Sequence, residues 1–455
     1  MAHITRRRLT VAAALGMAST LVLTGCGAAG GTGDGGGSSG GSKTVNVLMV
    51  NNPQMVDLQK LAPTFEKESG IKVNFTVQGE NDVRAKIATS FASQDGQYDV
   101  ATISNYETPT FAKNGWLSPL TDVANDKTFD QADILKPFTE SLTYKDQVYA
   151  EPFYGESSFL MYRKDVFEKA GLTMPDNPTW QQVADLAAKA DGAQSGMKGI
   201  CLRGMPGWGE IFGPLTTVVN TFGGTWFNKD WSAQVDAAPF KSAVKFYVDL
   251  VRAHGEAGAA QAGFTECLNA MTQDKVAMWY DATSAAGSLE APDSPVKGKI
   301  GYVAAPVEKT KQSGWLYSWA FAVQKAGKNQ DAAMKFIEWA SSKEYEELVG
   351  KELGWARVPA GKRTSTYSNA DYLKSASAFA DQTLNSINSV DPSNPGVQPR
   401  PAPGVQFVAI PEYADMATQV SQLVSSAIAG KTTVDQALQQ GQSIAVKEVT
   451  DKYQK

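Results

Sequence analysis

The sequence predicts an α/β protein of two lobes, each a mainly parallel sheet flanked by helices. From Val45 to Asn105 the apolar pattern alternates strand and helix in a βαβαβ order, which implies parallel strands joined by right-handed crossovers. Length is the second observation. Once the first 25 residues are set aside, 430 of the 455 residues remain, whereas a single hydrophobic core stops growing at about 250–300 residues. Two cores are therefore expected.

Each element of that order has its own signal. Val45–Val50 is a continuous apolar strand, Ile71–Gln78 alternates apolar with polar residues, and Tyr98–Ser104 is a third strand. Leu58, Leu61, Ala62 and Phe65 recur at helical spacing before Gly70, and residues 81–91 form a second helix. Polar side chains that follow such strands lie where parallel α/β sheets bind ligands. This singles out Asn51, Glu80 and Tyr106.

Later segments predict a second set of elements. A helix begins after Thr179 with Gln182 completing a capping box, and Thr433 with Gln436 marks another start of this kind. We also expect an amphipathic helix over Phe240–His254 and short strands over Ala277–Tyr280 and Lys299–Val303. Three further helices are expected over Asp331–Gly350, Pro411–Ala429 and Val434–Lys452.

The N-terminal segment predicts export. Arginines at 6–8 precede an apolar stretch over 9–23 that is too short for a permanent transmembrane helix but typical of a signal peptide. The stretch ends in Leu23-Thr24-Gly25-Cys26, where bacterial lipoproteins attach their lipid. We expect residues 1–25 to be removed and Cys26 to be lipidated. Arg6 and Arg7 also fit a twin-arginine signal, so the Sec and twin-arginine routes both stay open. Residues 26–43, rich in Gly and Ser, predict a flexible tether.

Composition narrows the function classes. The chain has a formal net charge of −5, and the three arginines of the leader leave −8 on the mature form. An acidic body without basic runs argues against nucleic acid as a partner. Only His254 remains outside the leader, which argues against a His-based catalytic triad or a His-rich metal site. No nucleophile motif or phosphate loop occurs, so we expect no enzyme, no metal and no cofactor.

Two cysteines remain after Cys26. Cys201 and Cys267 would lie in a compartment where disulfides persist. A disulfide between them is one interpretation, and two buried free thiols are the other.

Several loops combine aromatic rings with forked polar groups, as a polyol or sugar site requires. Aromatic rings cover the C–H faces of such a ligand, and carboxylates or guanidinium groups engage neighbouring hydroxyls. Tryptophans can also be core residues, which we expect for Trp180 and Trp339. The candidates are Tyr154, Glu156, Arg203, Trp208, Glu210, Asp281, Trp315, Trp319 and Arg357.

These loops resemble the extracellular solute-binding proteins of ABC importers, the family that includes maltose-binding protein, and within it the sorbitol/mannitol branch. The resemblance implies a two-lobed, type II periplasmic-binding-protein-like fold that closes on a small polyol or sugar and delivers it to membrane permease subunits. It further implies a monomeric receptor on the outer face of the cell membrane. The motifs that carry it are Phe153-Tyr154-Gly155-Glu156-Ser157-Ser158, Gly199-Ile200-Cys201-Leu202-Arg203-Gly204, Gly207-Trp208-Gly209-Glu210 and Asp281-Ala282-Thr283.

The resemblance also divides the chain. It implies an N-terminal lobe of residues 44–152 plus 276–325 and a C-terminal lobe of 153–275 plus 326–455, with crossings at Tyr149–Phe159 and Ala270–Asp281. The pocket is then expected between the lobes, built from Asn51, Glu80, Arg84, Tyr106, Asp281, Tyr154, Glu156, Arg203, Trp208, Glu210, Trp315, Trp319 and Arg357.

One motif departs from the pattern expected for the branch. Trp-Leu-Trp-Ala-Trp is expected, but the chain reads Trp315-Leu316-Tyr317-Ser318-Trp319, which leaves the exact polyol open. Two other function classes are alternatives: a lipoprotein glycoside hydrolase that uses Glu156 and Asp281 as acid and base, and a surface protein that adheres to carbohydrate.

Overall fold

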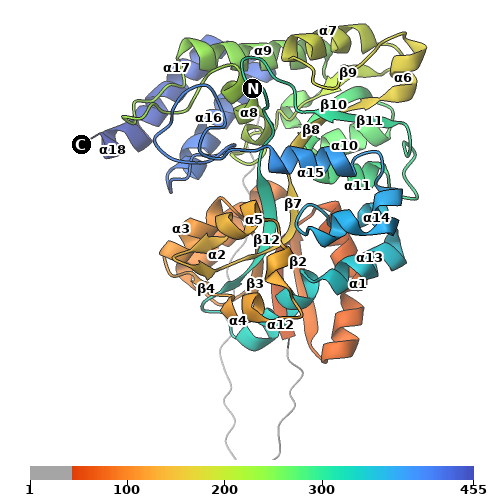
Figure 1. Ribbon diagram of the computed structural model, residues 1–455. Helices are drawn as coiled ribbons and strands as arrows, with labels where there is room; N and C mark the ends of the chain where they lie inside the picture. The colour runs from red at the N-terminus through yellow and green to blue at the C-terminus, as the bar shows by residue number, and fades with distance from the viewer. Residues whose placement is uncertain (1–43, 455) are drawn as a thin grey trace, which may run out of the picture. The chain divides into compact units, whose positions relative to one another are not determined.

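The computed structural model describes residues 44–454, which form two sheets flanked by helices (Figure 1). The predicted signal peptide, Cys26 and the tether lie outside the described residues. The two-lobed α/β fold class is confirmed. No helix within 44–454 is long and apolar enough to span a bilayer.

The first sheet has the strand order β2-β1-β3-β12-β4. β1 (Thr44–Val50), β2 (Lys72–Gln78) and β3 (Val100–Ser104) are parallel, as the βαβαβ pattern predicts, and α1 (Pro53–Ser69) and α2 (Glu80–Ser93) connect them. β3 is buried along its whole length, whereas β2 at the edge is partly exposed. Antiparallel strands complete the sheet: β12 (Tyr317–Gln324) pairs with β3, β4 (Leu117–Ser118) and β7 (Glu151–Glu156).

The second sheet has the order β11-β8-β10-β9. Its strands are β8 (Ser158–Arg163), β9 (Lys198–Cys201), β10 (Val276–Ala282) and β11 (Ile300–Ala304). Only β9 and β10 are parallel, since β8 runs antiparallel to both of its neighbours. The expectation of a mainly parallel sheet is therefore wrong for this lobe. β8 enters this sheet directly from β7 of the first sheet, so no βαβ crossover within this sheet sets its direction.

The strand pairing also corrects the predicted division of the chain. Within the Tyr149–Phe159 segment, β7 ends at Glu156 in one sheet and β8 begins at Ser158 in the other. The return was expected over Ala270–Asp281, but β10 there pairs with β8 and β9, and the chain re-enters the first sheet only with β12. The sequence of a short buried strand does not indicate which sheet the strand joins.

Helices near the C-terminus are likewise shared between the lobes. α12 (Gln330–Ala340) packs on β1 and β12, and α13 (Lys343–Leu353) packs on α1, although both were expected in the C-terminal lobe. α16 (Tyr413–Ile428) and α17 (Val434–Ala445) do pack on α9 (Ala238–His254) of the second lobe. Both predicted capping boxes are present, at the starts of α7 (Trp180–Ala190) and α17.

The remaining helices are α3 (Glu107–Lys113), α4 (Thr121–Asn125), α5 (Lys136–Ser141), α6 (Lys164–Lys169), α8 (Phe212–Thr221), α10 (Phe264–Thr272), α11 (Ala286–Leu289), α14 (Ala370–Ser375), α15 (Ala380–Asn388) and α18 (Asp451–Tyr453), and a small hairpin joins β5 (Thr143–Tyr144) to β6 (Gln147–Val148).

Candidate ligand-binding site

A cavity is lined by residues from both sheets and the segments that follow them. Its walls combine five aromatic rings with two arginines and two carboxyl groups, so apolar faces and charged forks are both present. The lining residues are Asn52, Glu80, Arg84, Glu156, Arg203, Gly209, Gly213, Phe264, Ala282, Ser284, Trp315, Tyr317, Trp319, Gln406 and Phe407, of which Tyr317 adds a phenol.

Arg203 is a cavity residue that a buried carboxylate holds in place. It follows β9 by two residues, and its Nε and Nη2 donate to the two carboxylate oxygens of Asp281 at 2.8 and 2.6 Å. Asp281 is fully buried and also accepts from the indole Nε1 of Trp279. Burial opposes the charge on Arg203, but the attraction of Asp281 holds its pKa well above the ordinary value. Asp281 therefore fixes the guanidinium group and does not itself line the cavity.

Arg84 supplies the second positive charge, from α2 of the first lobe. Its Nε and Nη2 donate to Oε1 of Glu80 at 3.1 and 2.9 Å, and Nη1 donates to Glu107 at 3.3 Å. Nη2 also donates to the hydroxyl of Tyr317 at 2.5 Å. The guanidinium carbon lies 4.5 Å from the ring centroid of Trp319, within the range of cation–π attraction.

Two carboxyl groups at the site, Glu156 and Glu210, have raised pKa values. Burial raises the pKa of Glu156 to about 8, although Ser284 donates a hydrogen bond of 2.6 Å to its Oε2. Burial and the negative charge of Glu80 raise the pKa of Glu210 to about 8 as well. Glu210 lies behind Arg203, which donates to it at 3.3 Å. At neutral pH these two carboxyls are mostly protonated, so Glu156 can donate as well as accept a hydrogen bond at the cavity wall.

The pKa of Glu156 predicts a pH dependence of stability. Its ordinary pKa is 4.5 and its folded value is about 8, so the folded state holds a proton that the unfolded chain releases between these values. Stability is complete below pH 4.5 and is lost as pH rises toward 8, by at most about 1.4 kcal/mol per pH unit for this one group. Urea unfolding from pH 5 to pH 8 should show a falling free energy, and Glu156→Gln should flatten the slope. An unchanged slope in the variant would contradict the assignment.

Two predicted tryptophans, Trp315 and Trp319, line the cavity. Both are almost fully buried, at 1% and 3% exposure. The indole Nε1 of Trp315 is a buried donor without a hydrogen-bond partner among residues 44–454. A buried donor of this kind is costly unless it is satisfied, so it suits a ligand hydroxyl.

Asn51 and Tyr154 do not line the cavity, contrary to prediction. Asn51 is exposed, and its neighbour Asn52 lines the cavity instead, since the turn into α1 directs successive side chains to different sides. Tyr154 is buried behind Asn52, which donates to its hydroxyl at 2.8 Å. Tyr154 therefore positions a cavity residue.

Trp208 and Tyr106 are also outside the cavity lining, contrary to prediction. Their ring centroids are 5.0 Å apart, and the hydroxyl of Tyr106 donates to the carbonyl of Ile410 at 3.0 Å. Trp208 is only 8% exposed and covers Arg84 at 4.1 Å. Tyr106 and Arg84 belong to the first lobe and Trp208 to the second, so these contacts join the lobes.

Arg357 is not brought to the cavity either. Its Nε and Nη2 donate to both carboxylate oxygens of Asp57 on α1, at 2.7 and 2.6 Å. The sequence cannot distinguish this ion pair from a ligand contact, because the two partners are 300 positions apart.

Several residues that line the cavity were not predicted from the sequence. Tyr317 lies between the predicted Trp315 and Trp319, and Ser284 follows the Asp281 motif closely, so both had a local signal. Phe264 had no such signal, because a phenylalanine at the start of a helix is typical of a core residue. Gln406 is a further cavity residue that was not predicted. The other unpredicted residues are Asn52, Gly209, Gly213, Ala282 and Phe407.

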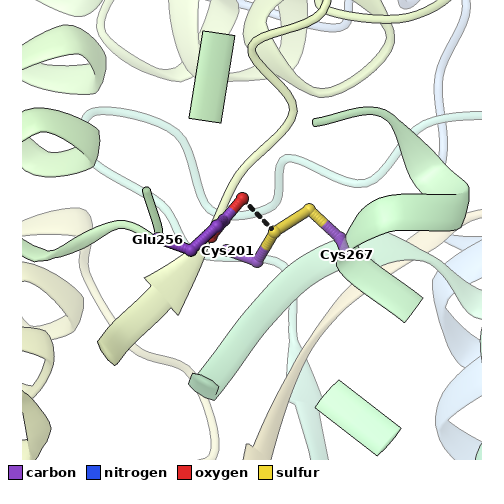
Figure 2. Close-up of side chains that lie close together, drawn as sticks. All are labelled: Cys201, Glu256 and Cys267. Carbon is purple, nitrogen blue, oxygen red and sulfur yellow. Dashed lines mark hydrogen bonds between the residues drawn. A yellow bond between two sulfur atoms is a disulfide. The ribbon is translucent and has the colours of Figure 1, made fainter. Parts of the chain in front are cut away.

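Cys201 and Cys267 form a disulfide in the second lobe (Figure 2), which confirms the first of the two interpretations. The bond joins the end of β9 to α10, elements that carry the cavity residues Arg203 and Phe264. Glu256 lies beside it, with Oε1 3.1 Å from the sulfur of Cys201, and burial raises the pKa of this carboxyl to about 7. Because the sulfurs are bonded to each other, neither is a thiolate that could bind a metal.

Comparison with known proteins adds an independent line of evidence. The profile of the bacterial extracellular solute-binding protein family matches residues 52–347. A mannitol-binding protein of Pseudomonas aeruginosa is 40% identical over 413 residues, 90% of this chain and 94% of the relative. An erythritol/L-threitol-binding protein of Mycolicibacterium smegmatis is 25% identical and covers 75% of this chain and 78% of its own length.

A solved structure is similar over almost the same range. It is an ABC transporter solute-binding protein from Agrobacterium vitis with bound D-mannitol. Its sequence is 46% identical, its TM-score is 0.88, and the alignment covers 90% of this chain and 99% of the other.

Proposed function

This chain belongs to the family of bacterial extracellular solute-binding proteins, and we propose that it captures a sugar alcohol, with D-mannitol the first candidate, for an ABC importer. The family places it outside the cytoplasm and makes it a binding protein rather than an enzyme. Mannitol is supported by the mannitol-binding relative and by the similar structure with bound D-mannitol, at 40% and 46% identity.

The observation that carries the proposal is the composition of the cavity wall. Arg84 and Glu80 come from the first lobe, and Arg203 comes from the second. A linear polyol offers vicinal hydroxyls to such forks and C–H faces to the tryptophans. A ligand that contacts both lobes at once favours their closed arrangement, since contacts to one lobe alone shift no equilibrium between open and closed states.

The cavity also argues against the glycoside hydrolase. That alternative needs Glu156 and Asp281 as an acid and a base facing the ligand. Asp281 is instead bound to Arg203 through both oxygens and is fully buried, so it cannot activate water in the cavity.

A thermal-shift screen tests the function. Mannitol, sorbitol, ribitol, hexoses and maltose would each be added at equal concentration to the mature protein. A ligand present at about a hundred times its Kd adds about 2.7 kcal/mol of stability. We expect the hexitols to raise Tm most. A rise with maltose and none with any polyol would contradict the proposal.

We further propose that the protein is a monomeric lipoprotein anchored through Cys26, after export by the Sec or twin-arginine route. The basic and apolar leader and the Leu23-Thr24-Gly25-Cys26 segment support this. Cys26→Ala should move the protein from the membrane fraction to the soluble extracytoplasmic fraction, because a lipid-free chain loses its hydrophobic anchor. Immunoblots of the two fractions measure it, with Ser38→Ala in the tether as the matched control. A Cys26→Ala variant that stays with the membranes would contradict the anchor.

A further inference from the structure

A groove larger than the cavity runs beside it, and Arg84 is the one residue of the described chain that lines both. Tyr106, Phe111 and Trp116 line the groove from the first lobe, and Pro206 and Trp208 line it from the second. The cavity and the groove are therefore neighbouring spaces that share one side chain as a wall.

Two tryptophans and three hydrogen-bond acceptors surround that side chain. Trp319, which lines the cavity, and Trp208, which lines the groove, lie 4.5 and 4.1 Å from the guanidinium carbon. Glu80, Glu107 and Tyr317 accept hydrogen bonds from its three nitrogens. To swing aside, the guanidinium would have to leave buried carboxylates without a partner, which costs several kcal/mol.

We propose that Arg84, clamped between Trp208 and Trp319, is a partition that closes one end of the cavity and restricts the ligand to an unsubstituted, short-chain polyol. This rests on the proposed function. Arg84 thereby becomes a specificity-determining residue, because it excludes ligands that continue beyond the cavity. Trp208 contributes from outside the cavity by covering the far face of the guanidinium.

Mannitol with a glucosyl group on a terminal hydroxyl, here glucosyl-mannitol, is the probe that this geometry suggests. The two ends of D-mannitol are equivalent by its twofold symmetry, so the substituted end can be the one that faces Arg84. The glucosyl group would have to occupy the position of the guanidinium to reach the groove. The aromatic rings of the groove then offer faces on which a sugar ring can stack.

Calorimetric titration of the mature protein with mannitol and with glucosyl-mannitol tests the partition. The wild type should bind mannitol and discriminate strongly against glucosyl-mannitol. Arg84→Ala should lower the ratio of the two Kd values by about tenfold or more. Arg84→Met is the matched control, because it loses the same charge but fills much of the same space, and it should keep most of the discrimination.

The outcomes separate this inference from the proposed function. Equal affinity of the wild type for both ligands, or an Arg84→Ala ratio equal to that of the wild type, overturns the partition and leaves mannitol capture intact. No binding of any polyol by the wild type overturns the proposed function itself. If Arg84→Ala does not fold, the Arg84→Ala, Glu107→Gln double variant is titrated in its place. The glutamine removes the carboxylate charge that Arg84→Ala leaves unpaired, and its amide oxygen can still accept the hydrogen bonds from Ser104.

Discussion

Arg203→Ala is expected to abolish mannitol binding and to lower the free energy of unfolding by about 3–5 kcal/mol. The arginine is the only positive partner of Asp281 among the described ion pairs, and Asp281 is fully buried. Its removal leaves that carboxylate without its ion-pair partner and takes away the hydrogen bond that Arg203 donates to Glu210. The cavity also loses its charged hydrogen-bond donor from the second lobe. A polyol would then gain less binding free energy from the second lobe, so it would favour the closed arrangement of the lobes less. Urea unfolding measures the first effect and calorimetric titration the second.

Arg203→Lys is the control that separates charge from geometry. It keeps the positive charge near Asp281 but loses the planar fork that donates to both carboxylate oxygens. We expect Arg203→Lys to fold with a smaller loss of stability and still to bind mannitol at least about tenfold more weakly. If Arg203→Ala binds mannitol with wild-type affinity, Arg203 is not a ligand residue.

Removal of the disulfide is expected to produce the second large effect. The Cys201→Ala, Cys267→Ala double variant loses a cross-link between residues 66 positions apart. The entropy gained by the unfolded chain for a loop of this size is worth about 4 kcal/mol. The bond ties β9 to α10, so the variant should also bind mannitol more weakly, because Arg203 and Phe264 lose a fixed separation.

Thermal unfolding of the oxidised protein, the reduced protein and the double variant measures this effect. The reduced protein and the double variant should lose similar stability, and the double variant should no longer respond to reductant. Counting free thiols in the oxidised, denatured Cys26→Ala protein should find none. Two reactive thiols would show that the bond does not form in solution.

Local patterns were sufficient for much of the fold. The three parallel strands of the first sheet and both capping boxes were predicted correctly, because strand alternation and caps depend on residues within a few positions of each other. The sheet that β10 joins was not predictable in this way. Every residue of Val276–Ala282 is buried, so this strand has no polar face that would indicate which strands lie beside it.

Among the candidate site residues, the chemical types were predictable and the individual roles were not. Of the candidates, Glu80, Arg84, Glu156, Arg203, Trp315 and Trp319 line the cavity. Asp281 and Arg357 carry the same kinds of charge, but each is paired with a partner distant in the sequence. A sequence shows that a carboxylate or guanidinium is present, but not which partner already occupies its hydrogen bonds.

The sequence alone therefore determined the fold class, the family resemblance and the polar and aromatic character of the site. Only the tertiary structure decided which of those side chains face a ligand and which hold another residue in place. Trp208 shows the reason. Its glycine-rich surroundings suggested a ring offered to the ligand, but Tyr106 and Phe407 pack against it at 5.0 and 4.9 Å and Arg84 covers its face. Such contacts join segments that are far apart in the chain, so the local spacing of residues does not predict them.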